Sequence, residues 1–94
     1  MGNGITRIYA GTPTFLNVAA TTTPTALPSA YGRYLEIKNL CGTGAGIVAD
    51  HGAGTPTFTI PDGIAQTFHL QHNASELRVA MSAGSYTIDC EVWG

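Results

Sequence analysis

Glycine and proline punctuate this chain at short intervals, and β-branched residues fill most of the gaps between them. The sequence has 12 Gly and 5 Pro in 94 residues, and helix signals are nearly absent. Short strands at regular spacing, separated by turn residues, are typical of all-β sandwiches and barrels. We therefore predict an all-β protein, an antiparallel β-sandwich (jelly-roll-like) of about eight short strands with an extended N-terminal arm or loop. The expected strands cover residues 5–10, 14–19, 33–40, 46–50, 56–60, 64–70, 76–80 and 85–93.

Tight turns between the expected strands indicate that the sheets are antiparallel. Pro61-Asp62-Gly63 is a strong turn tripeptide, because proline fixes its own φ and glycine tolerates a positive φ. The sequence His51-Gly52-Ala53-Gly54 joins two expected strands as a hairpin loop. Connections this short join antiparallel neighbours, since parallel strands need a longer crossover.

Alternation along the strands separates a buried from an exposed face, because successive residues of a strand point to opposite sides. In the last strand, Asp89, Glu91 and Trp93 share the outward face. Glu36 and Lys38 do the same in the strand of residues 33–40. The residues of opposite parity form the predicted core: Leu35, Ile37, Ile47, Phe58, Ile60, Phe68, Leu70, Leu77, Val79, Ile88, Cys90 and Val92.

The segment of residues 19–31 differs from the rest, because it has neither charge nor hydrophobic periodicity. We expect a single domain over residues 1–94, in which residues 1–33 provide one or more N-terminal strands and this uncharged arm or loop. Two interpretations stay open: a mobile surface loop, or an arm that becomes ordered against a neighbouring subunit. The absence of charge extends over residues 8–32, which is where we expect neighbouring subunits to lie.

Charged residues are scarce in this sequence. Only 11% of the residues are charged, against about 25% in an average soluble domain. The net charge of −2 and the lack of a basic run argue against nucleic acid as a partner, since binding it needs clustered Lys and Arg. No apolar run approaches the roughly 20 residues of a membrane span, so no membrane partner is expected. The low content of charged residues indicates either a monomer coated by uncharged polar residues or a surface covered by other subunits.

The residues that carry chemistry are few and dispersed, and we expect no catalytic residue, no cofactor and no metal. Cys41 and Cys90 fall on core faces and lack metal-ligand spacing. No secretory signal is visible, so free thiols are expected rather than a disulfide. His51, His69 and His72 are too dispersed to indicate a metal cluster.

Asp89 and Glu91 lie two residues apart on one strand face, which superficially resembles the carboxylate pair of a glycosidase. Such a pair belongs in a deep cleft, and a sandwich this small rarely forms one. We therefore expect a solvated strand face, and the chain is predicted not to be an enzyme.

Aromatic and apolar residues in the first third of the chain and at its end are the candidate contact sites. Trp and Tyr are enriched at protein interfaces. Trp93, the single tryptophan, lies on a polar strand face, where it either anchors an interface or covers a neighbouring strand. The candidate interface residues are Tyr9, Phe15, Leu27, Tyr31, Tyr34 and Trp93.

A run of turn and strand patterns spans residues 34–94. The strand Tyr34-Leu35-Glu36-Ile37-Lys38-Asn39-Leu40 comes first, and Pro61-Asp62-Gly63, Phe68-His69-Leu70, Leu77-Arg78-Val79, Ser82-Ala83-Gly84-Ser85 and the ending Val92-Trp93-Gly94 follow it. This pattern resembles that of small β-sandwich accessory proteins of tailed-bacteriophage virions. The resemblance carries over no functional residue, because the family has no catalytic motif.

The resemblance implies a non-enzymatic virion structural protein, most simply a capsid decoration (cement) protein that stabilises the head by binding across capsid-subunit junctions. Its implied partners are the major capsid protein or other virion proteins. It also implies a homo-oligomer, with a trimer favoured, and a location in the virion after assembly in the host cytoplasm.

Two alternatives stay open for the function. A tail or neck component of the virion would share every sequence feature. A host-attachment (carbohydrate-binding) module should gather exposed aromatic residues on one face. The aromatic residues here fall mostly at predicted core positions, which weighs against that module.

Overall fold

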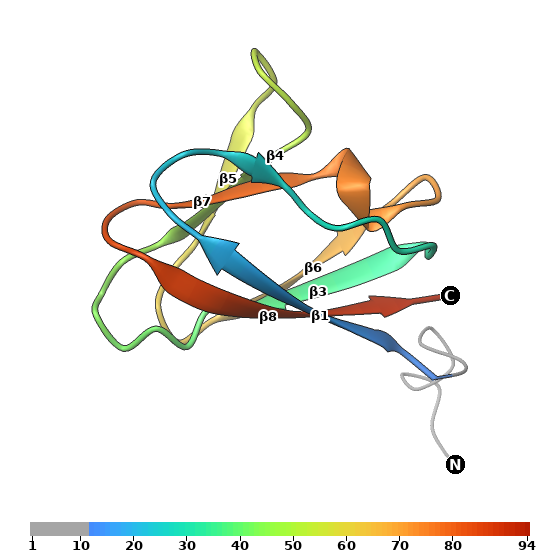
Figure 1. Cartoon of the computed structure of the whole chain (residues 1–94), viewed down its shortest axis with the longest axis horizontal. Helices are drawn as coiled ribbons and strands as arrows, with labels where there is room; N and C mark the ends of the chain where they lie inside the picture. The colour runs from blue at the N-terminus through green and yellow to red at the C-terminus, as the bar shows by residue number, and fades with distance from the viewer. Residues whose placement is uncertain (1–11) are drawn as a thin grey trace.

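The computed structural model describes residues 12–94, and within them eight strands form two packed four-stranded antiparallel sheets (Figure 1). Sheet A has the strand order β1-β8-β3-β6, and sheet B has the order β2-β7-β4-β5. The expected strand over residues 5–10, with Tyr9, lies outside the described residues. The elements are β1 (Thr14–Ala20), β2 (Thr25–Ala26), β3 (Tyr34–Lys38), β4 (Ile47–Asp50), β5 (Thr57–Ile60), β6 (Ala65–His69), the 3₁₀ turn η1 (Ala74–Glu76), β7 (Arg78–Met81) and β8 (Tyr86–Trp93).

The strands pair in a nested order. β1 pairs with β8, β2 with β7, β3 with β6, and β4 with β5. β3 also pairs with β8, and β4 with β7, which joins these four pairs into two sheets. The chain is thus one long hairpin, with the β4–β5 loop at its tip, that is rolled up into a jelly roll. This loop projects at the top of Figure 1, and the predicted antiparallel, jelly-roll-like sandwich is confirmed.

The core lies between the two sheets and largely follows the predicted alternation. Eleven of the twelve predicted core residues are buried, among them Leu35, Ile37 and Ile88 at 0% exposure. Phe58 is the exception, because 48% of it is exposed. It lies opposite the buried Ala49 and so points toward the core side. However, β5 is an edge strand, so no strand of residues 12–94 lies on its outer side, and the ring packs edge-on against Phe68 with 6.0 Å between centroids.

Asn39 is a fully buried polar residue at the end of β3. Its Nδ2 donates to the carbonyl oxygens of Ala45 and Ile60, at 2.9 and 2.8 Å, and its Oδ1 accepts from the backbone N–H of Cys41. A buried amide is tolerated only when it is hydrogen-bonded. Asn39 therefore ties the end of sheet A to the loop that precedes β4 and to the end of β5.

In this structure the segment of residues 19–31 is not an extended arm but a surface crossing that includes a short strand. Its first two residues belong to β1, it then forms β2 against β7, and Tyr31 makes an isolated bridge with Asn73. Ala20 and Leu27 are buried at 1% and 2% exposure. These two buried apolar side chains anchor the uncharged segment that passes from β1 of sheet A to β2 of sheet B.

The predicted strand over residues 76–80 begins later than expected, because a capped turn precedes it. The Asn73 side chain accepts from the backbone N–H of Ser75, and the Glu76 side chain accepts from the backbone of Asn73 in return. This capping box stabilises η1 and delays β7 to Arg78. In the described part of the chain no helix is suited to crossing a membrane.

Candidate interaction surface

The outward side of sheet A gathers aromatic and charged side chains from β1, β8, β3 and a residue of β6. Phe15 lies opposite Glu91, and Tyr34 lies opposite both Trp93 and His69. Alternation then assigns every second residue of these strands to the same side. We call this surface the sheet A face. Its large or polar members are Phe15, Asn17, Tyr34, Glu36, Lys38, His69, Asp89, Glu91 and Trp93, with Leu40 just beyond β3.

Three of the candidate interface residues come together on the sheet A face. Phe15 is 68% exposed, although it is a large apolar side chain. Tyr34 and Trp93 are half-buried, and they occupy directly opposed positions in β3 and β8. The His69 ring packs edge-on against Tyr34, with 5.0 Å between ring centroids.

The other candidate interface residues lie elsewhere. Tyr31 is 68% exposed, but it precedes β3 and pairs with Asn73. The assignment of Leu27 to an interface is wrong in this structure, because its side chain is 2% exposed and belongs to the core. Tyr9 lies outside the described residues.

The expectation that most aromatic residues sit in the core is also wrong. Of the aromatic residues in the described range, only Phe68 is buried. The exposed ones are Phe15, Tyr31 and Phe58, and the half-buried ones are Tyr34, Tyr86 and Trp93. The premise that weighed against a carbohydrate-binding module therefore does not hold.

Among residues 12–94, the sheet A face carries a net charge of −2, equal to that of the whole chain. Of the 6 acidic and 4 basic residues in the sequence, Glu36, Asp89, Glu91 and Lys38 lie on this face, and the remaining three acids and three bases cancel. The Lys38 Nζ binds Glu91 at 2.8 Å and lies 3.9 Å from Glu36. The hydrogen bond that Lys38 donates to Glu91 is the main reason why the pKa of Lys38 lies above its ordinary value.

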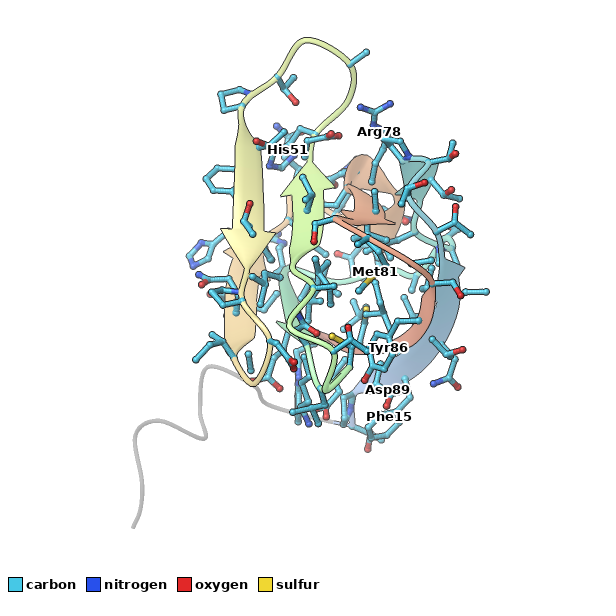
Figure 2. The ribbon with its side chains drawn as sticks, turned by 90° about the vertical axis from the view of Figure 1, so that its left-hand side faces the viewer. Phe15, His51, Arg78, Met81, Tyr86 and Asp89 are labelled. Atoms are coloured by element: carbon cyan, nitrogen blue, oxygen red, sulfur yellow. The ribbon has the colours of Figure 1, made fainter. Side chains whose placement is uncertain are left out.

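A shallow hollow of about 280 Å³ lies on the sheet A face beside Phe15. Phe15 and Leu40 contribute its exposed apolar side chains, at 68% and 64% exposure. Lys38, Asp89 and Glu91 line it as well, together with Asn17, Leu16 and Cys90. Figure 2 shows Phe15 and Asp89 close together at the lower end of the molecule.

Asp89 is the carboxylate of this hollow that makes no direct ion pair within residues 12–94, although Lys38 lies opposite it in β3 and its charge acts on Asp89 at longer range. Its Oδ1 accepts a 2.5 Å hydrogen bond from the uncharged Asn17 amide. No Lys, Arg or His nitrogen of residues 12–94 lies within 4.0 Å of it, because the ammonium of Lys38 turns to Glu91 instead. Asp89 is exposed and Glu91 is half-buried, and both lie on the outward face of β8, as the alternation predicts.

Metal-ligating side chains do not converge in the part of the chain that the structure covers. No group of three or more His, Cys, Asp or Glu residues there could hold a metal ion. His51 lies in the β4–β5 loop, while His72 Nδ1 lies 3.8 Å from Glu76. Cys41 and Cys90 are free thiols, as predicted.

Sequence reasoning missed several residues of the hollow, among them Asn17, Lys38 and Leu40. Lys38 and Leu40 share the outward parity of Tyr34, so the alternation of β3 contained this signal. What the sequence did not contain was the pairing of β1 with β8, which brings Phe15 and Asn17 to the same place. No family model, no curated protein and no solved structure matches the chain.

Proposed function

We propose that the chain is a non-enzymatic structural protein of a tailed-bacteriophage virion, a decoration protein that binds across capsid-subunit junctions as a homo-oligomer. The observation that carries the proposal is the sheet A face. It combines the exposed Phe15 with Tyr34 and Trp93, and it holds charge equal to the whole net charge of the chain. Interfaces are enriched in such aromatic residues and are rimmed by polar ones.

Exposed apolar area is the physical reason to expect docking through this face. Phe15 and Leu40 expose more than half of their surface, and burying a large apolar side chain contributes about 1.5–3 kcal/mol. A specific interface covers about 800 Å² per partner. Contacts of this kind, repeated at many capsid junctions, would stabilise a shell cooperatively.

The jelly-roll fold is compatible with this proposal but does not select it. Jelly rolls occur both in viral capsid proteins and in lectins, and a fold by itself does not specify a function. The support therefore comes from the residues on the sheet A face and from the resemblance of residues 34–94 to virion accessory proteins.

Binding to capsids tests the proposal. The purified chain is characterised by native mass spectrometry and then cosedimented with expanded capsids of the phage whose genome encodes it. We expect an oligomer that binds, and Phe15→Ser should weaken binding at least about tenfold, as for an interface hot spot. Phe58→Ser is the matched control, because Phe58 is also exposed but belongs to β5 of sheet B. A stable monomer without capsid affinity, or equal losses in both variants, would overturn the proposal.

A carbohydrate-binding module for host attachment is the second candidate. It is favoured by the gathering of Phe15, Tyr34 and Trp93 on one face beside carboxylates. A glycan array probed with the labelled chain separates the candidates, since selective glycan binding that Phe15→Ser abolishes would support the module. A tail or neck position is distinguished by labelling the protein in intact virions.

A further inference from the structure

We propose that the hollow between Phe15 and Leu40 receives an arginine side chain from the protein on which the sheet A face docks. This inference deepens the proposed function and rests on its claim that the face binds a protein. It identifies the partner by its chemistry, as a surface that presents a guanidinium group.

Charge complementarity is the first argument. In the described part of the chain, three carboxylates share the sheet A face with one ammonium, that of Lys38, which is already bonded to Glu91. Among residues 12–94, Asp89 accepts a hydrogen bond only from the neutral amide of Asn17, on Oδ1, and Lys38, opposite it in β3, attracts it at longer range without a direct ion pair. A cation of the partner would therefore meet a carboxylate that has no direct ion pair within residues 12–94, whereas an acidic partner would meet a net negative face.

The apolar walls of the hollow are the second argument, and they favour arginine over lysine. Phe15 and Leu40 are the most exposed large apolar side chains on this face, and both line the hollow with Asp89. An arginine has an aliphatic stem that packs on such walls and a planar guanidinium that stacks on an aromatic ring. The same guanidinium binds carboxylates with directed hydrogen bonds, and a cation over an aromatic face gains further attraction.

The size of the chain, 9.8 kDa, allows a direct test by nuclear magnetic resonance. The amide resonances of the full chain are followed while the blocked peptide acetyl-Ala-Arg-Ala-amide is added. We expect saturable shifts centred on Phe15, Asn17, Leu40 and Asp89. A peptide with citrulline in place of arginine, which has the same shape without the charge, should bind at least about threefold more weakly.

Two variants that remove the same charge locate the site. Asp89→Asn should weaken binding of the arginine peptide about three- to fivefold, since an exposed charge pair contributes modestly. Glu36→Gln removes an equal charge from the same face but lies outside the hollow, and it should change the affinity less than about twofold. Similar effects of the two variants would mean that the peptide senses only the general charge of the face, which would overturn the assignment.

Other outcomes would also overturn the proposal that the hollow binds arginine. Shifts that appear elsewhere, or that are equal for the citrulline peptide, would overturn it. So would a result in which an N-acetylglucosamine trisaccharide shifts the hollow resonances and the arginine peptide does not, since the hollow would then be a sugar site. The titration needs no capsid, so its failure is distinct from a failure of capsid binding.

Discussion

The guanidinium of Arg78 binds the carboxylate of Asp50 in a bidentate pair, with Nε 2.7 Å from Oδ1 and Nη2 3.0 Å from Oδ2. The two residues are directly opposed in β7 and β4, on the outer side of sheet B. The backbone N–H of Gly52 also donates to Asp50. The hydrogen bond from Arg78 is the main reason why the pKa of Asp50 lies below its ordinary value of 3.8.

This pair makes stability depend on pH in a defined direction. Because the pKa of Asp50 is lower in the folded chain, the stabilisation is present above 3.8 and lost as the pH falls through the folded pKa. We expect Arg78→Met to be destabilising near neutral pH, and the effect to shrink by at least about half toward pH ~2. Urea unfolding at both pH values measures this change. Arg78→Lys keeps the positive charge but loses the bidentate geometry of the guanidinium, so its loss of stability should lie between those of the wild type and Arg78→Met. A loss of stability in Arg78→Met that does not depend on pH would contradict the prediction.

Asp62 and Glu76 add to the same acid sensitivity. Backbone N–H groups of Gly44 and Gly42 lower the pKa of Asp62 from 3.8. Burial alone would raise the pKa of Glu76. Three backbone N–H donors outweigh the effect of burial and hold the pKa of Glu76 below 4.5. Both folded pKa values lie below the ordinary ones, so Asp62→Asn should flatten the loss of stability between about pH 4 and pH 2. Unfolding midpoints across that range test it, and an unchanged acid slope would contradict it.

Asn39 should be among the most sensitive polar positions in the protein. In Asn39→Ala, the carbonyl groups of Ala45 and Ile60 lose the amide donor, and Ala45 keeps only the weak Cys41 thiol at 3.4 Å, so we expect a loss of about 2–4 kcal/mol in the free energy of unfolding. Asn17→Ala is the control, because Asn17 is exposed and its removal should change stability by about 0.5 kcal/mol or less. Denaturant unfolding of the two variants compares them. Similar losses would mean that Asn39 does not hold the loops.

The alternation of residues predicted most of the fold, because burial on one face of a strand leaves a period of two in the sequence. This is why Leu35, Ile37 and the other core residues of β3, β7 and β8 were assigned correctly. Alternation does not say whether a strand lies at the edge of a sheet, which depends on pairing between distant segments. Phe58 has core parity and still remains half-exposed for that reason.

Phe58 should consequently tolerate truncation better than its neighbour Ile60. We expect Phe58→Ala to cost about 1–2 kcal/mol of unfolding free energy, largely through its edge-on contact with Phe68. Ile60 is 1% exposed, so Ile60→Ala should cost about 2–5 kcal/mol. Thermal or urea unfolding ranks the two variants, and the reverse order would place the Phe58 ring inside the core after all.

The candidate surface was less accessible to sequence reasoning than the core. Residue type predicts Phe15, Tyr34 and Trp93 as contact residues, but it does not show that they share a face. Leu27 lies in an uncharged segment and looked equivalent to them in the sequence. In the structure it follows β2, its backbone N–H donates to the carbonyl oxygen of Leu77, and its side chain is buried. The nested pairing of the jelly roll decides both cases.

The two thiols of the chain differ in exposure and so in expected reactivity. Cys90 is 1% exposed in β8, and its burial raises its pKa to about 12, with a smaller contribution from the charge of Asp89. Cys41 is half-buried in the loop after β3. Because the thiolate is the reactive form, Cys90 should be inert while the protein is folded.

Alkylation with iodoacetamide near pH ~8 tests this difference. We expect Cys41 alone to be modified in the folded protein and both thiols in urea, as counted by mass spectrometry. Cys41→Ser should leave no reactive thiol until the chain unfolds. The raised pKa also predicts that stability is lost as the pH rises above the ordinary thiol value of 9.0, since the unfolded chain then releases a proton that the folded Cys90 keeps. Equal modification rates for the two thiols in the folded state would show that β8 opens at least as readily as the loop after β3.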